Sequence, residues 1–266
     1  MRPRPTAVRR TALAASAAAL ALFATACGGD QADDAAEEKG GATASASAAP
    51  ATTAAAKALT AAELEKAALT QADVKSGKVA EKVPAQDDIA QDKVKADDEA
   101  CAPLAYLQSG TYAGEPAATV KRAWQGEAKK PAAGASAEDT MLAAIDLEKV
   151  VLTLASYEGG GAEQVMKDLN AAAGKCAGGF SYTAGGTKNE VLKVTTTQAP
   201  EGADEAIALT LSLSAEEGVK APMKSVVVRK GATVAYVPAV NLASAASGKD
   251  FDFPAEIVEA QLGKLG

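Results

Sequence analysis

Few side chains of this sequence could carry out chemistry. Histidine is absent from all 266 residues, which excludes Ser-His-Asp and Cys-His catalysis, His-ligated metal sites and histidine pH switching. No serine lies in a GxSxG motif, and no SxxK occurs with its supporting motifs. Glycines 159–161 precede a predicted helix, but no Lys-Ser or Lys-Thr follows as in a P-loop, so we interpret them as a helix-start turn. The sequence predicts no catalytic residue, no metal site and no cofactor.

Acidic clusters are the remaining candidates for a cation or carboxylate site. Two of them, residues 87–88 and 97–99, lie in a charged and weakly patterned stretch at residues 75–99 that we interpret as a solvated loop. Asp204 and Glu205 open a predicted strand and could form a surface ion pair with Arg229 across the sheet. A hydrolase that uses carboxylates alone is therefore the least favoured hypothesis, and it would need two inward carboxylates about 5–10 Å apart.

Cys27 lies where an amino-terminal apolar run ends. Four arginines and no acidic residue precede the run at residues 11–23, and small residues follow it, as in a secretory signal peptide. The segment FATAC resembles the lipobox of bacterial lipoproteins, although Ala24 stands where leucine is usual. The resemblance implies cleavage after Ala26, diacylglycerol on the Cys27 sulfur and acylation of the new amine. A plain signal peptide with a coincidental cysteine is the alternative.

The charge of the processed chain restricts its partners. Removal of residues 1–26 takes away four arginines, so the net charge falls from −7 to about −11. This charge argues against nucleic acid and against electrostatic docking on anionic lipid. Acyl chains such as palmitate on Cys27 would provide the membrane attachment, on the outer face of the cell membrane. The Arg9-Arg10 pair leaves both Sec and twin-arginine export open.

Cys101 and Cys176 form an even pair once Cys27 is assigned to lipid. In an oxidising compartment they have only each other as disulfide partners. A redox-active pair would need CxxC-type proximity and a depressed thiol pKa, and the sequence shows neither. We therefore predict a structural disulfide that joins an early helix to a later one.

The composition changes sharply along the chain. Hydrophobic residues make up 48% of it, but 67 of them are alanine, which buries little area. Residues 27–57 contain no Leu, Ile, Val, Met or aromatic residue, and we expect a disordered tether there. Residues 58–266 are long enough for one modest domain.

Apolar patterns place the elements of this domain. Five strands are predicted from apolar runs and alternation, at residues 150–157, 191–197, 206–213, 224–229 and 233–237. Helices are predicted at residues 60–69, 101–107, 162–175 and from Pro254 onward. The expected fold class is α+β, an antiparallel sheet of about five strands covered by helices. Within it, Tyr157, Tyr236 and Trp124 could line a ligand cleft, or they could pack in the core.

Segments along the whole domain are similar to the PknH-like sensor domain of actinobacterial lipoproteins and PknH-type receptor kinases. The resemblance depends on their order and spacing, in LTAAELEKAALTQADV (59–74), CAPL (101–104), LASYEGGGAEQ (154–164), NAAAGKCAGG (170–179), GADEAIAL (202–209), VVVRKGATVAY (226–236) and the final EAQLGKL. It implies a mixed helix-and-sheet ectodomain with a cleft for an unidentified extracellular ligand. The kinase-linked domain has two disulfides, whereas this chain can form one. Any signal from this chain would have to pass through a partner protein, or there would be none.

Two functions follow as hypotheses. The first is a non-enzymatic, lipid-anchored ligand-binding or sensing module, and the second is a structural lipoprotein that docks an envelope protein and binds no small molecule. A well-formed cleft beside Tyr157 and Tyr236 would favour the first.

Overall fold

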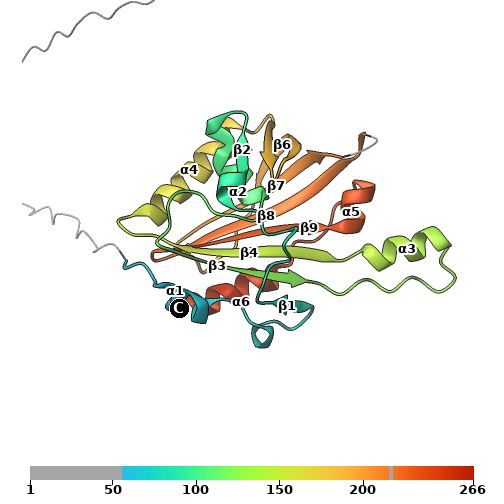
Figure 1. The fold of residues 1–266 in the computed structure, drawn as a ribbon. Coiled ribbons are helices and arrows are strands. Elements are labelled where there is room, and N and C mark those ends of the chain that lie inside the picture. The colour runs from blue at the N-terminus through green and yellow to red at the C-terminus, as the bar shows by residue number, and fades with distance from the viewer. Residues whose placement is uncertain (1–55, 216–217) are drawn as a thin grey trace, which may run out of the picture. The chain divides into compact units, whose positions relative to one another are not determined.

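Nine antiparallel strands form one sheet in the computed structural model, which describes residues 56–215 and 218–266 (Figure 1). The strand order is β1-β3-β4-β9-β8-β7-β6-β5-β2, so strands β5 to β9 form a meander and the two shortest strands lie at the edges. The strands are β1 Lys78–Ala80, β2 Val94–Ala96, β3 Ala118–Gln125, β4 Glu148–Ser156, β5 Phe180–Ala184, β6 Thr187–Thr197, β7 Glu205–Ser214, β8 Lys220–Lys230 and β9 Thr233–Asn241.

Six α-helices and three short 3₁₀ turns lie entirely within the described residues and accompany the sheet. The helices are α1 Ala61–Ala67, α2 Ala102–Gln108, α3 Ala137–Ile145, α4 Gly161–Lys175, α5 Leu242–Ser247 and α6 Ala255–Leu265, and the turns are η1 Gln71–Asp73, η2 Gln91–Lys93 and η3 Glu99–Cys101. Helix α1 begins at Thr60, whose side chain and that of Glu63 form the predicted capping box. Helix α4 follows the predicted glycine turn, in which Gly160 has a φ of 82°.

The sheet is covered on both faces, and each face has its own core. On β7, the large residues Ile207, Leu209 and Leu211 belong to the cluster under α2 and α4, whereas Ala206 and Ala208 face the cluster under α1 and α6. Figure 1 shows α2 and α4 on one side of the sheet and α1 and α6 on the other. The fold class is therefore α+β as predicted, with helices on both faces of the sheet.

The prediction of about five strands is wrong, because four more strands complete the sheet. β1, β2 and β5 have only three to five residues, which is too short for an alternating pattern to be recognised. β3 carries Lys121 and Arg122 at its centre, and these charges interrupt the apolar pattern from which a strand would be predicted. The expected loop at residues 75–99 therefore contains both edge strands. Long neighbouring strands supply the backbone partners that let such weak segments pair.

The connection from β3 to β4 forms an arm that carries α3. Ser136 accepts a hydrogen bond from the Asp139 backbone N–H and caps α3. No residue of α3 is buried. Figure 1 shows α3 beyond the end of the sheet, next to α5.

Candidate functional site

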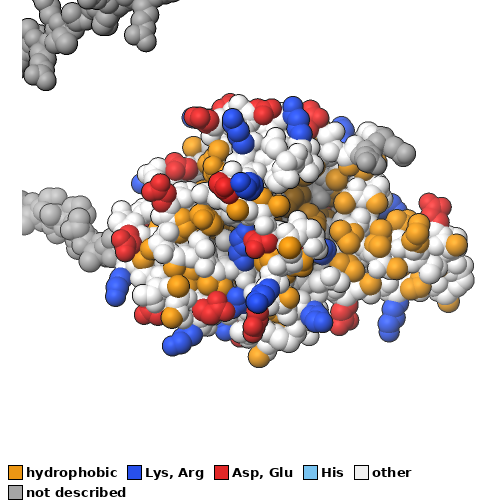
Figure 2. Space-filling view, in the orientation of Figure 1, with side chains coloured by type: hydrophobic (Ala, Val, Ile, Leu, Met, Phe, Trp, Pro, Cys, Tyr) orange, Lys and Arg blue, Asp and Glu red, His pale blue; other side chains and the backbone are white. Residues whose placement is uncertain are grey.

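A cleft of about 1070 Å³ lies on the face of the sheet that carries α2 and α4. Its floor is formed by residues of β3, β4, β8 and β9 that point to this face, and Trp124 and Val150, which belong to the other face, also border it. Figure 2 shows a hollow beside α5, with apolar side chains around it. The floor residues are Ala123, Gln125, Lys149, Val151, Met223, Pro238 and Val240.

Three segments wall the cleft. One is the end of α2 with the turn that follows it, and another is the hairpin between β5 and β6. The third, which we call the strap, is residues 84–91, between the edge strands β1 and β2. Gln91 fixes the end of the strap, because its Nε2 donates to the carbonyl oxygens of Tyr112 at 3.1 Å and Gly114 at 3.0 Å.

Two lysines from the floor strands hold the strap. Lys121 Nζ lies 2.8 Å from Asp88 Oδ1 and donates to the Ile89 carbonyl oxygen at 3.0 Å. Lys149 Nζ lies 3.5 Å from Asp87 Oδ2. The acid cluster that the sequence placed in a solvated loop thus fastens a wall of the cleft, although both carboxylates are partly exposed and each pair contributes little stability.

The inner end of the cleft contains Gln108, the last residue of α2. Its side chain is buried, and Nε2 donates to Ser225 Oγ at 3.3 Å. Its Oε1 is buried as well and has no hydrogen-bond partner among the described residues. Buried polar atoms normally have partners, so this acceptor is an exception that requires an explanation.

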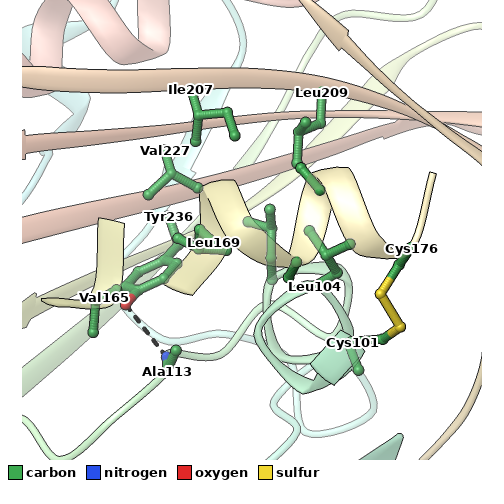
Figure 3. Close-up of a cluster of buried hydrophobic side chains, with 14 of the residues drawn as sticks. Cys101, Leu104, Ala113, Val165, Leu169, Cys176, Ile207, Leu209, Val227 and Tyr236 are labelled. Atoms are coloured by element: carbon green, nitrogen blue, oxygen red, sulfur yellow. Dashed lines mark hydrogen bonds between the residues drawn. A yellow bond between two sulfur atoms is a disulfide. The ribbon is translucent and has the colours of Figure 1, made fainter. Parts of the chain in front are cut away.

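The disulfide predicted between Cys101 and Cys176 is present and lies outside the cleft. Their Cα atoms are 6.0 Å apart, and both residues are buried (Figure 3). Cys101 precedes α2 and Cys176 follows α4, so the bond joins the two helices that cover this face. Leu104 and Leu169 from these helices pack in the same cluster. The bond therefore fixes α2, which carries Gln108 at its other end.

Tyr157 and Tyr236 lie together in the core, and neither lines the cleft. Their hydroxyl oxygens are 2.7 Å apart, and Tyr236 accepts from the backbone N–H of Ala113 at 3.3 Å. Burial raises the pKa of Tyr236 to about 12, and burial together with the adjoining Tyr236 hydroxyl raises the pKa of Tyr157. The core-packing interpretation describes both residues. The cleft of about 1070 Å³ is not the one expected beside them, because neither residue lines it, although it lies on the same face of the sheet.

Trp124 lies at the edge of the cleft, but its ring belongs to the other face of the sheet. It packs in the cluster under α1 and α6, and its Nε1 donates to the Ser76 carbonyl oxygen at 3.0 Å. Of the three aromatic candidates, only this one borders the cleft. Sequence reasoning missed Gln108, Lys149 and the strap. The one available signal was a polar residue, Gln108, at the end of an apolar helix.

The other charged candidates have structural partners. Arg229 pairs with Asp204 and Glu205 as predicted, and also with Glu163 at the start of α4. Within residues 56–215 and 218–266, no cluster of three or more Cys, Asp or Glu side chains could hold a metal ion. None of the helices in these two ranges is long and apolar enough to cross a membrane. Ala26, Cys27 and all but the last two residues of the tether lie outside the described residues.

Comparison with known proteins gives a structural similarity but no sequence match. Neither the protein-family models nor the curated proteins include a match to the chain. Among solved structures, it is similar to the extracellular domain of PknH from Mycobacterium tuberculosis, with 11% identity and a TM-score of 0.42. The match covers 79% of this chain and 95% of that one. At this identity and TM-score, it does not place the chain in a family.

Proposed function

We propose that this protein is a lipid-anchored, extracytoplasmic module that binds a ligand in the cleft without transforming it. The observation that carries the proposal is the cleft itself, about 1070 Å³ in volume, which is as large as typical small-molecule sites. Its lining combines an apolar floor with a few polar groups, the composition that such sites use for affinity and orientation.

Two features of the chain support the extracytoplasmic location. The apolar run that ends at Cys27 has the form of a lipoprotein signal, and the buried disulfide suits an oxidising compartment. Lipid on Cys27 and the small-residue tether would let the domain extend from the outer face of the membrane. The ordered sequence resemblance to the PknH-like sensor domain points in the same direction.

The test is native mass spectrometry of the protein purified from its own host. We expect a reproducible additional mass, and we expect Ala123→Trp to remove it because the indole would fill the cleft floor. Thr195→Trp is the matched control, since Thr195 is exposed on β6 and does not line the cleft. No additional mass on the wild type, or the same mass on both variants, would contradict the proposal.

A second candidate function is docking of an envelope protein through α3 and α5. Met141 on α3 is 65% exposed and Leu242 on α5 is 37% exposed, and these two helices contact each other. Exposed apolar residues that gather on adjoining elements are typical of interaction surfaces. If docking is the function, Met141→Glu will abolish cross-linking to an envelope partner and leave any cleft-bound mass unchanged.

A further inference from the structure

The inner end of the cleft is rich in hydrogen-bond acceptors. Gln108 is 7% exposed, lines the cleft, and has its amide nitrogen engaged by Ser225. Its Oε1 is the unpartnered atom. Because a buried acceptor without a donor is costly, its retention indicates that something outside the described residues supplies a donor.

A second acceptor lies on the floor beside it. Ladder pairing between β4 and β9 is interrupted between Val150–Ala239 and Thr153–Tyr236, where Val151 lies opposite Pro238. Proline has no backbone N–H, so Pro238 cannot donate to the Val151 carbonyl oxygen. Val151 and Pro238 both line the cleft. Pro238 is also the β9 partner of Ser225, which places this interruption next to the Gln108 amide.

The charges around the cleft cancel. The lining contains Lys78 and Lys149, and it contains Asp87 and Glu127, so the two signs are equal. Lys149 and Asp87 are already paired with each other. Lys78 and Glu127 are exposed, so their charges are solvated. A ligand with a net charge would have to break the Lys149–Asp87 pair or rely on one of these solvated side chains, and the surrounding floor is mostly apolar.

We infer that the cleft selects an uncharged amphipathic molecule that donates a hydrogen bond, from a hydroxyl or an amide N–H, to Gln108 Oε1. The apolar part of the ligand would lie along Val151, Pro238 and Val240 on the floor. This inference rests on the proposed function, because it specifies what the same cleft binds.

The experiment compares four six-carbon probes on the full chain by ligand-observed NMR titration. Hexanamide donates N–H groups, N,N-dimethylhexanamide keeps the carbonyl but donates none, and hexanoate and hexylammonium carry charge. We expect hexanamide to bind at least about fivefold more tightly than the dimethyl analogue, the minimum effect of leaving a buried polar group unpaired. We also expect it to bind more tightly than either ion.

Gln108→Met should bind the two amides equally, because methionine has a similar reach and no acceptor of comparable strength. Gln125→Met is the matched control, since Gln125 is a lining residue on β3 away from Gln108, and it should keep the wild-type preference. Ala123→Trp should remove binding of every probe.

The outcomes separate the inference from the proposed function. Equal binding of both amides by the wild type, abolished by Ala123→Trp, would overturn the donor requirement and leave the cleft as a binding site. Preference for either ion would overturn the inferred neutrality. Absence of binding by all four probes would count against the inference and the proposed function together. The wild-type comparison alone decides the donor requirement if Gln108→Met does not fold.

Discussion

Removal of the disulfide should lower the free energy of unfolding by about 4–5 kcal/mol. Cys101 and Cys176 are 75 residues apart, and closing a loop of that length in the unfolded chain accounts for this amount in the chain-entropy model. The loss would be large for a domain of this size, whose total stability is on the order of 5–15 kcal/mol. The bond also joins α2 to α4 above the sheet, so its removal loosens the helix that carries Gln108.

The assay is denaturant unfolding of the Cys101→Ala/Cys176→Ala double variant, followed by the fluorescence of Trp124, the only tryptophan. The unfolding midpoint should fall strongly. Cys27→Ala is the matched control, since it removes a cysteine without touching the disulfide, and its midpoint should not change. Thiol labelling of the folded wild type should find both sulfurs of the pair unreactive. A loss below about 1 kcal/mol would refute the loop-closure argument.

Three further predictions concern pH, a tight turn and the membrane anchor. Burial raises the pKa of Tyr182 and of Tyr236 to about 12 from the usual 10.0, so the fold favours the neutral hydroxyls. The contribution of these two hydroxyls to the free energy of unfolding should be fully present below pH 10 and should be lost as the pH rises toward 12. Unfolding midpoints measured across this range should therefore fall, and a constant midpoint would contradict the burial of the two tyrosines. Gly77→Ala should cost about 1–3 kcal/mol, because its φ is 71° and a Cβ atom there would meet a carbonyl oxygen at 2.5 Å, and Gly134→Ala, with a φ of 80° but open space, should cost less. Cys27→Ala should move the protein from the membrane fraction to the soluble fraction, and retention in the membrane would oppose the lipid anchor.

Five of the nine strands could be predicted because each carries its own pattern of burial. β4 has apolar residues on both faces, and β7 alternates large residues with small ones. The pairing of Cys101 with Cys176 followed from counting the cysteines, once Cys27 was assigned to lipid and an oxidising compartment was expected. β3 escaped prediction because Lys121 and Arg122 lie on opposite faces of the strand, one holding the strap and the other buried against α1.

The position and the lining of the cleft could not be predicted from the sequence. Its floor combines residues from strands that are far apart in the chain, and its strap was indistinguishable from a solvated loop until Lys121 and Lys149 were seen beneath it. Tyr157 and Tyr236 have polar tips that suit a cleft wall, but their hydroxyls satisfy each other in the core.

The sequence by itself predicted the α+β class, an export-type amino terminus and the cysteine pair, because these predictions depend on local periodicity and on counting. Only the tertiary structure decided which side-chain polar atoms form hydrogen bonds with residues far away in the chain. Gln108 ends an ordinary helix, and its significance arises because Ser225 engages one amide atom and no described residue reaches the other. Local hydrogen bonds such as the Thr60–Glu63 capping box follow from sequence spacing, but hydrogen bonds between residues far apart in the chain depend on the tertiary geometry.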